Sequence, residues 1–464
     1  MQAKTIDYSI FKTGDVRGRY PEQVTPQVLF AIGRAMSGLL RGLIVIGRDG
    51  RIGSPELEKA IIAGLRAGAA EQPGNKIRLL RLGRITTPML YYIVRMLRAG
   101  GGAIITASHN PKTDNGVKVV GPGAYLFSTT ELREAVRAQT ALLKAGRPLP
   151  KAKQTRAQML RAYVAFLKRR LKLRRSVHVV ADCSNGVTAI VLKALRSSLG
   201  VKSRLRLSLI NSTIDGAFPA HGPNPFLPGA TEQLSREVVR RKADMGVVFD
   251  GDGDRVFFVD GSGKPLSGDE AAVFLARAHT GAVVGDLRLG WAMRKYLASN
   301  RRAMIDVRVG QRFIREAMRE HDAHFGAELS GHYYFRELGG ADSGIFAAHV
   351  AASVLSELKG SMAEALRELA PYDHSGEINF EIQESERKQA LIEKITTKYK
   401  RQATQVSRLD GVKMEFGKPG ELGAWWVSAR TSNTEPVLRL IIEANTPALL
   451  QQRLAEITSI IKTF

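Results

Sequence analysis

Short apolar runs alternate with stretches of helical periodicity in the first quarter of the chain. LIVIG at 43–47 predicts a buried strand, and 55–70 has the apolar spacing of a helix. The alternation continues with an apolar strand pattern at 77–83, a helical one at 88–100 and another strand at 103–108. Strands and helices that alternate in this way are typical of a parallel sheet covered by helices.

Two further sets of the same kind follow, and the tail has a different order. The second set begins with VHVVADCSNG at 177–186 and ends at 244–263, which predicts a hairpin whose turn is rich in Asp and Gly. The third set runs from about 268 to 359. In the tail, the strands INFEI, AWWVSAR and VLRLIIEA accompany a polar helix and a closing helix, which indicates a small α+β module. The polar, proline-containing segment 144–154 is a predicted linker.

The composition is that of a globular protein with several cores. The chain has 464 residues, of which 44% are hydrophobic and 24% charged, and this length suggests about three domains. The single cysteine, Cys183, excludes an internal disulfide and predicts a reducing, cytoplasmic location. The first residues lack the apolar core of a signal peptide, and no run of about 18 apolar residues occurs. We therefore expect no membrane span and no membrane partner.

A net charge of +25 is unusual for a metabolic enzyme and raises nucleic acid or another polyanion as a partner. No nucleic-acid-binding motif accompanies the charge, so we favour a basic surface without such a partner. The densest run, KRRLKLRRS at 168–176, follows an amphipathic pattern and predicts the solvated end of a helix. A positive field would also attract an acidic small substrate.

The loop TASHNPK at 106–112 allows three interpretations. In a hydrolase, Ser108 would be the nucleophile and His109 its base, but adjacent residues of an extended chain point to opposite sides. The G-x-S-x-G motif of hydrolases is also absent. In a phosphotransferase, Ser108 would accept and donate a phosphoryl group, with cations and a metal ion nearby. An ordinary Ser-His-Asn-Pro turn is the third interpretation.

The second candidate loop, FDGDGDR, favours phosphoryl transfer. Asp250, Asp252 and Asp254 alternate with glycines, and alternate residues of an extended segment face the same way. Three converging carboxylates would repel one another without a cation, and hard divalent ions take oxygen ligands. The segment is not an EF-hand, because Arg255 and Gly261 stand where that loop needs glycine and glutamate. The alternative is an acidic hairpin turn.

Two further loops carry weaker signals. In GAELSGHYYF, Glu328, Ser330 and His332 alternate, so that one face would present a carboxylate, a hydroxyl and an imidazole, which suit sugar hydroxyls. In ARTSNTEPVLR at 429–439, a guanidinium, hydroxyls and an amide gather in a turn with the composition of a phosphate site. A half-exposed strand and an ordinary β-turn are the respective alternatives.

Taken in order, the four loops resemble the phosphoserine, metal, sugar and phosphate loops of the α-D-phosphohexomutases, most closely the phosphomannomutase/phosphoglucomutase branch. The resemblance extends over the whole chain and includes further motifs. These are DVRGR at 15–19, GRDGR at 47–51, TTP at 86–88, HGPNP at 221–225 and ADSG at 341–344. It implies four domains around a central cleft, at 1–145, 155–260, 261–366 and 372–464. The first three would be related mixed α/β domains and the last an α+β domain.

The resemblance also implies a reaction, namely reversible transfer of phosphate between O1 and O6 of a hexose through a bisphosphorylated sugar. Ser108 would carry the phosphoryl group, and Ser108, Asp250, Asp252 and Asp254 would hold one Mg²⁺ per chain. Implied around the transferring group are Arg17, His109, Lys118, Arg255 and His332, with Lys118 or His332 as proton carrier. Implied substrate ligands are Glu328, Ser330, Arg430, Ser432, Asn433, Thr434 and Arg439. A hexose 1,6-bisphosphate would be the activator, and the protein would be a monomer or dimer.

Several departures from the family pattern affect substrate preference. Leu329 stands where methionine is usual, Arg288 where a lysine is, Gln311 where a histidine is, and Gly14 where a tyrosine is. Phosphoglucosamine mutase is an alternative, although that branch commonly has Gln at the position of Leu329. A polyanion or nucleic-acid binder, a phosphatase and a pseudoenzyme are further alternatives. The intact phosphoserine and metal loops disfavour the pseudoenzyme.

Overall fold

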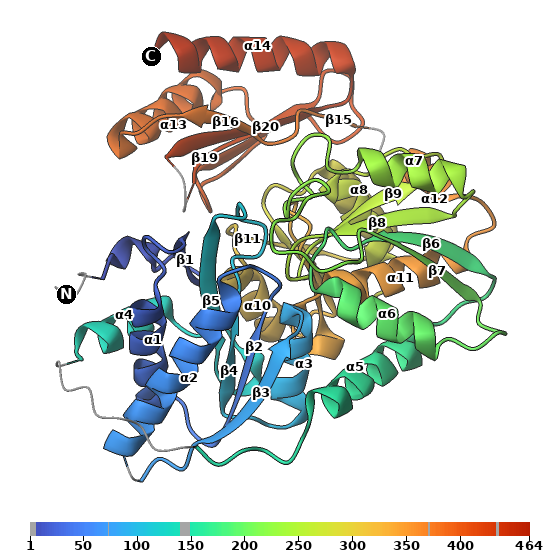
Figure 1. Cartoon of the computed structure of the whole chain (residues 1–464). Coiled ribbons are helices and arrows are strands. Elements are labelled where there is room, and N and C mark those ends of the chain that lie inside the picture. The colour runs from blue at the N-terminus through green and yellow to red at the C-terminus, as the bar shows by residue number, and fades with distance from the viewer. Residues whose placement is uncertain (1–5, 73, 140–148, 370–371, 433–435) are drawn as a thin grey trace. The chain divides into compact units, whose positions relative to one another are not determined.

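The computed structural model describes residues 6–72, 74–139, 149–369, 372–432 and 436–464 (Figure 1). Contacts divide the chain into two compact units. The first comprises Met1–Ser267 and Ser330–Ala363, and the second comprises Gly268–Leu329 and Glu364–Phe464. The units are discontinuous along the chain, so the four domain boundaries expected from the sequence stay a prediction. Among the described residues, no helix has the length and apolar character needed to cross a bilayer.

The first unit begins with a five-stranded mixed sheet in the order β1-β5-β4-β2-β3. β2 is parallel to β3 and β4, whereas β5 is antiparallel to both β4 and β1. The strands and helices predicted between 43 and 108 are all present. The elements are η1 (Tyr8–Ile10), β1 (Val16–Arg19), α1 (Pro26–Leu39), β2 (Leu43–Arg48), α2 (Ser54–Glu71), β3 (Arg78–Arg84), α3 (Thr87–Met96), β4 (Gly101–Ile105), β5 (Asp114–Val120), η2 (Pro122–Ala124) and α4 (Thr129–Arg137).

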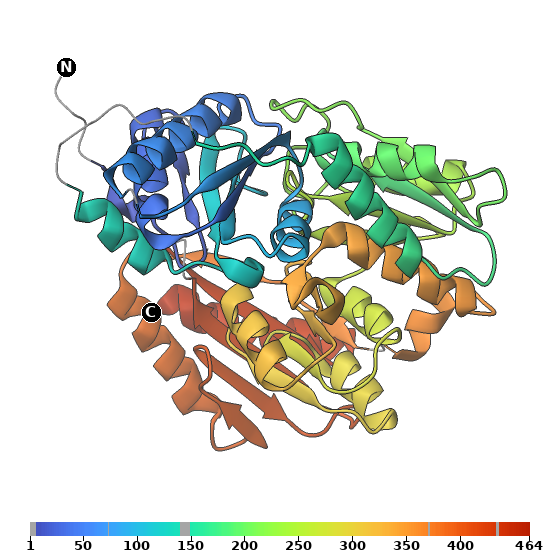
Figure 2. The same cartoon turned by 90° about the horizontal axis from the view of Figure 1, so that it is seen from below.

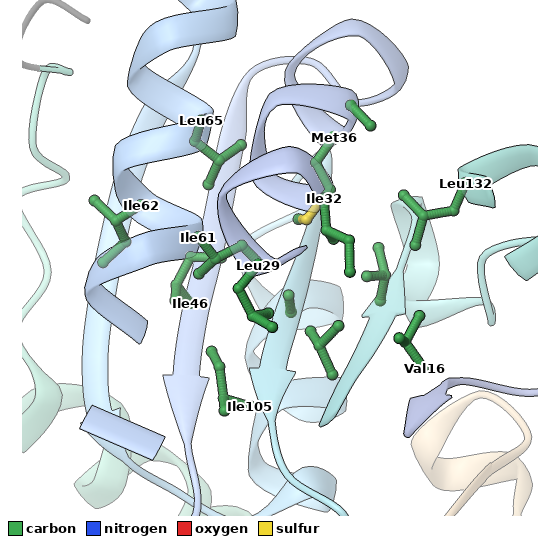
Figure 3. Packing of buried hydrophobic residues seen from close by; sticks show 14 of the residues in the cluster. Val16, Leu29, Ile32, Met36, Ile46, Ile61, Ile62, Leu65, Ile105 and Leu132 are labelled. Atoms are coloured by element: carbon green, nitrogen blue, oxygen red, sulfur yellow. The ribbon is translucent and has the colours of Figure 1, made fainter. Parts of the chain in front are cut away.

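The core of this sheet lies beneath α1 and α2, where buried aliphatic side chains such as Leu29, Ile32 and Ile61 pack together (Figure 3). Glycines let the two helices approach closely. A Cβ on Gly33 would lie 2.1 Å from the carbonyl oxygen of Ile61, and one on Gly64 would lie 1.9 Å from that of Phe30. Larger residues at these two positions would force the helices apart and open the core.

The first unit also contains a four-stranded sheet in the order β7-β6-β8-β9. β6 is parallel to β7 and β8, and β8 and β9 form the predicted hairpin with its acidic turn. Helices α5 and α6 lie side by side next to this sheet (Figures 1 and 2). The remaining elements of the first unit are α5 (Arg156–Arg170), β6 (Val177–Asp182), α6 (Thr188–Ser198), β7 (Leu205–Ile210), α7 (Glu232–Arg240), β8 (Met245–Phe249), β9 (Val256–Asp260), β13 (Tyr333–Phe335), η3 (Arg336–Leu338), β14 (Ala341–Asp342) and α11 (Gly344–Glu357). β13 and β14 are not strands of this sheet and pair with each other.

The second unit combines a parallel α/β part with an antiparallel sheet. β10 lies between β11 and β12 and is parallel to both. In the C-terminal part, the sheet order is β15-β20-β19-β18-β17, β16 also pairs with β20, and α13 and α14 pack on one face (Figure 1). The elements are α8 (Gly268–Ala276), β10 (Val283–Asp286), α9 (Trp291–Ser299), β11 (Met304–Val307), α10 (Gln311–Glu320), β12 (Phe325–Ala327), α12 (Met362–Leu369), β15 (Asp373–His374), β16 (Ile378–Glu381), α13 (Ser385–Tyr399), β17 (Gln405–Ser407), β18 (Val412–Phe416), β19 (Trp425–Thr431), β20 (Val437–Ala444) and α14 (Pro447–Thr463). The fold class expected from the sequence, three mixed α/β parts and one α+β part, is confirmed.

Candidate active site

Ser108 lies just beyond the carboxyl end of β4 and is fully buried. Its backbone has φ +52°, in the left-handed region, and its N–H donates to Thr106 Oγ1 at 2.9 Å. The hydroxyl donates to Asp250 Oδ2 at 2.6 Å and lies 3.4 Å from Asp254 Oδ1. The serine of the first sheet therefore meets the acidic turn of the second sheet inside one compact unit.

The left-handed backbone corrects one expectation. Because Ser108 is not extended, its neighbour His109 does not point away, and His109 Nδ1 lies 3.4 Å from Ser108 Oγ. The imidazole nevertheless lacks the character of a strong base. Burial, then Arg255 and Arg17, lower the pKa of His109 well below its ordinary value. The ring is therefore neutral near pH 7, and its other nitrogen, Nε2, lies 3.4 Å from an Arg255 amino group.

Arg51 holds the Ser108 loop in place. Its buried guanidinium donates four hydrogen bonds of 2.6–3.0 Å to backbone carbonyls, those of Ser108, Asn110, Pro111 and Asp114. Asp49 Oδ2 lies 3.2 Å from its Nε. Since a planar guanidinium fixes the directions of its donors, this one side chain defines the course of the loop.

Asp250, Asp252 and Asp254 are fully buried in the turn that follows β8. They converge through a tight turn rather than through an extended segment, because Gly253 has φ +80° and Asp250 Oδ1 accepts bonds from the N–H groups of Gly253 and Arg255. Carboxylate oxygens of the three aspartates lie within 4.8 Å of one another.

The aspartate turn is hydrogen-bonded to α3, a helix that packs on the first sheet. Thr87 Oγ1 donates to Asp252 Oδ2 at 2.6 Å, and Thr87 N donates to the Asp252 carbonyl at 3.0 Å. These two bonds hold the aspartate turn against α3, and so fix the turn relative to the Ser108 loop.

The mutual repulsion of the three buried aspartates favours a bound cation. Burial, then the neighbouring Asp254 and Asp252, raise the pKa of Asp250 well above its ordinary value. Asp252 Oδ1 is buried and accepts no hydrogen bond from the residues that the structure describes. A hard divalent ion would relieve the repulsion and supply the missing partner. The three carboxylates can therefore hold a metal ion.

Lys118 lies in β5 and is 2% exposed. Its ammonium forms ion pairs with Asp254 and, at 3.2 Å, with Asp252. Burial alone would lower the pKa of Lys118, but the two aspartates hold it well above its ordinary value. In this arrangement Lys118 is a stable cation, not a base.

The remaining predicted residues of the first unit also gather around the turn. Arg17 binds Asp15 and the side chain of Asn110. Arg255 Nε donates to His332 Nε2 at 3.2 Å, and Ser330 Oγ lies 3.2 Å from His332 Nδ1. The segment from 328 to 332 forms a turn rather than the expected strand, with Gly331 at φ +84°.

A second cluster of functional groups lies in the second unit. Glu377 accepts bonds from Arg288 (3.0 Å), Arg430 (2.9 Å) and Arg439 (3.0 Å). Burial favours the neutral acid, but the three guanidiniums outweigh it and lower the pKa of Glu377 to about 2. Asp286 pairs with Arg288 through two bonds of 2.9 and 2.7 Å. The three arginines can bind an oxyanion, and in this structure the Glu377 carboxylate engages them.

The other predicted residues of this unit are only partly described. Glu328 is buried and its Oε1 accepts a bond from Gly310 N at 3.0 Å. The Ser432 N–H donates to the Val437 carbonyl at 3.0 Å. Asn433 and Thr434 lie outside the described residues.

Sequence reasoning missed the positioning roles of Arg51, Thr87, Asp286 and Glu377. Arg51 and Thr87 belong to the quoted motifs GRDGR and TTP, so a signal was present without a role. Glu377 precedes the strand INFEI with no local pattern that marks it, because its partners come from the loop after β10 and from the strands β19 and β20.

Comparison with known proteins agrees with this geometry. Sequence profiles of phosphoglucomutase/phosphomannomutase match four consecutive parts of the chain. The alpha/beta/alpha domains I, II and III match residues 8–143, 161–263 and 267–372, and the C-terminal domain matches 377–460.

Relatives and a solved structure match nearly the whole chain. A protein of Xanthomonas campestris described as phosphohexose mutases is 31% identical, over 97% of this chain and 99% of its own length. The phosphomannomutase of Salmonella typhimurium is 32% identical over 94% of both chains. The crystal structure of a phosphoglucomutase/phosphomannomutase family protein from Burkholderia thailandensis has a TM-score of 0.83 and 25% identity, and covers 99% of this chain and 98% of its own. The chain therefore belongs to the phosphoglucomutase/phosphomannomutase family of α-D-phosphohexomutases.

Proposed function

We propose that the protein interconverts hexose 1-phosphates and hexose 6-phosphates, with mannose or glucose as the sugar, through a phosphoserine and a hexose 1,6-bisphosphate. The observation that carries this proposal is the buried Ser108 hydroxyl, 2.6 Å from a carboxylate of a three-aspartate turn. This position places a potential phosphoryl carrier beside carboxylates that can hold a cation. The names of the relatives, phosphomannomutase and phosphohexose mutases, support the substrate class.

The reaction consists of two phosphoryl transfers. In the first, the bond between phosphorus and Ser108 Oγ breaks, a bond from phosphorus to a free sugar hydroxyl forms, and the hydroxyl proton leaves to a base. In the second, the other phosphoryl group of the bisphosphate returns to Ser108 Oγ and the sugar oxygen takes up a proton. The sugar turns over between the two transfers, so that either end can react.

Residues of the first unit would balance the charge of the transferring group. Arg17, Lys118 and Arg255 contribute cations, and His109, which stays neutral, adds a polar contact without a charge. Lys118 is our first candidate for the proton carrier because its buried ammonium lies at the acidic turn, and His332 is the second candidate. Both lie within the network of Asp254.

We propose Mg²⁺ as the metal ion and Ser108, Asp250, Asp252 and Asp254 as the residues that would hold it. When bound, this ion offsets negative charge on a phosphoryl oxygen. A trace of hexose 1,6-bisphosphate would be needed to phosphorylate Ser108 and keep the enzyme active.

The second unit would bind the part of the substrate that does not react. We propose that Glu328, with Ser330 of the first unit, binds sugar hydroxyls, and that Arg430, Ser432, Asn433, Thr434 and Arg439 bind the second phosphate. Because Glu377 already engages Arg430 and Arg439, the incoming phosphate would compete with an internal carboxylate.

The direct test is conversion of mannose 1-phosphate and glucose 1-phosphate to their 6-phosphates with Mg²⁺ and a trace of hexose 1,6-bisphosphate. We expect turnover of both, a loss of more than about 10³-fold in Ser108→Ala, and no change in the exposed control Ser197→Ala. Chelation with EDTA should abolish turnover reversibly. Turnover retained in Ser108→Ala would refute the assigned carrier, and turnover of glucosamine phosphate alone would select the phosphoglucosamine alternative.

A further inference from the structure

The positive charge of the chain is concentrated in one segment. Residues 151–206 contain 15 of the 69 lysines and arginines, and the only acidic residue among them is Asp182. Asp182 is fully buried, where it accepts bonds from Ser184 N and the Asn211 side chain. The cations of this segment therefore have no carboxylate from their own stretch of chain at the surface.

The fold gathers several of these cations at one end of the first unit. The Lys168 ammonium, in the last turn of α5, donates to the Ser198 carbonyl at the end of α6, at 2.6 Å. The Arg204 guanidinium donates to the Leu173 carbonyl at 2.8 Å, which joins the start of β7 to the segment after α5. These contacts join the chain segments that carry the exposed side chains of Lys168, Arg169, Arg170, Arg196, Lys202 and Arg204. We call these six residues the basic end.

The basic end is not neutralised within the unit. None of its six side chains forms an ion pair with any residue that the structure describes, whereas Arg175, a few residues on, pairs with Asp244 at 2.8 Å. A surface of unpaired cations at the end of a domain costs self-repulsion, so its natural counterpart is an external polyanion.

The exposed side chain of Val201 indicates which class of polyanion the basic end would bind. Val201 lies in the loop between α6 and β7, directly beside Lys202, and is fully exposed at 107%. The sequence has no Phe, Tyr or Trp from 167 to 206, and the preceding Phe166 is buried and covered by Arg170, whose guanidinium carbon lies 4.2 Å from the ring centroid. Single-stranded nucleic acids bind through exposed aromatic rings, which residues 167–206 lack, whereas exposed cations near an exposed apolar side chain match an anionic lipid surface.

We propose that the basic end binds the surface of membranes containing anionic phospholipids, with the cations near the headgroups and Val201 entering the interfacial layer. This is contact with a surface and not a span, and it differs from the expectation from the sequence that the protein has no membrane partner. The proposal is independent of the catalytic assignment, because none of the six residues belongs to the candidate active site.

The test is co-sedimentation of the full-length protein with vesicles of phosphatidylcholine alone or with about 30% phosphatidylglycerol. We expect binding to the anionic vesicles only, falling as NaCl rises. Each removed cation should weaken partitioning about fivefold, so the triple variant Arg169→Gln/Arg196→Gln/Lys202→Gln should lose about 100-fold. Val201→Ser, which leaves the charge unchanged, should weaken binding several-fold.

A matched control separates this surface from net charge. Lys400→Gln/Arg401→Gln/Lys418→Gln removes the same charge from exposed positions of the second unit and should retain wild-type binding. All variants should keep wild-type mutase turnover, which shows that they are folded. Absence of binding to anionic vesicles, equal losses in both triple variants, or preferential binding of a duplex DNA competitor would each overturn the proposal.

Discussion

The replacement Glu377→Gln tests whether the oxyanion site of the second unit is held closed by an internal carboxylate. The amide keeps the size of the side chain and removes its charge, while Arg288, Arg430 and Arg439 remain. The pKa of Glu377 is lowered from 4.5 to about 2, and a tenfold difference in proton affinity corresponds to about 1.4 kcal/mol. The ionised carboxylate, which is 8% exposed, thus stabilises the folded state by about 3 kcal/mol.

The pH dependence follows from the sign of this shift. Because the pKa is lower in the folded state, the contribution is complete above about pH 4.5 and disappears as the pH falls toward 2. The free energy of unfolding of Glu377→Gln should therefore be about 3 kcal/mol below that of the wild type at pH 7. The difference between the two proteins should shrink at pH 3.5.

Urea denaturation followed by tryptophan fluorescence is a suitable assay, since all three tryptophans, Trp291, Trp425 and Trp426, belong to the second unit. Inorganic phosphate should restore more stability to Glu377→Gln than to the wild type, because it gains access to guanidiniums that the carboxylate otherwise engages. The exposed control Glu381→Gln should change the unfolding free energy by less than about 0.5 kcal/mol. A loss as small in Glu377→Gln, or no differential effect of phosphate, would refute the reasoning.

Three further outcomes are expected. Arg51→Lys should lose about 2–3 kcal/mol of stability and most turnover, since one ammonium cannot serve four carbonyls; unchanged thermal unfolding and activity would contradict this. In urea titrations, Gly42→Ala should lower the free energy of unfolding by roughly 1 kcal/mol, and Gly253→Ala should lower it further. Both glycines have positive φ, but only a Cβ at position 253 would meet Thr188, at 2.5 Å. Burial raises the pKa of Cys183 to about 12, so mass spectrometry should show no alkylation by iodoacetamide at pH 8 without urea; rapid native labelling would contradict its burial.

The fold class and the central chemistry were predictable because they depend on local patterns. Apolar runs such as LIVIG at 43–47 gave β2, and the clustering of Asp250, Asp252 and Asp254 marked a cation site. The reason offered for that convergence was wrong, however, since the aspartates meet through a turn with Gly253 at positive φ and not on one face of a strand. Alternation alone does not reveal a left-handed residue.

What was not predictable depends on contacts between distant segments. The position of His109 follows from the left-handed backbone of Ser108, which Arg51 and its four carbonyl contacts maintain. The role of Glu377 depends on Arg288, Arg430 and Arg439, which lie in other segments of the chain, so its own sequence context does not reveal it. The direction of the Lys118 pKa likewise follows from two aspartates more than 130 positions away.

The discontinuity of the first unit has a consequence for biosynthesis. Helix α11 is buried over most of its surface and packs on β6, β8 and β9, but it begins 84 positions after β9 ends, at Gly344 against Asp260. At roughly 5–20 residues per second, a ribosome needs on the order of 4 to 17 seconds to supply it after the sheet. During that interval an apolar face of the sheet is not covered by α11. We therefore expect the nascent chain to need chaperone protection and a fragment ending at Ser267 to aggregate.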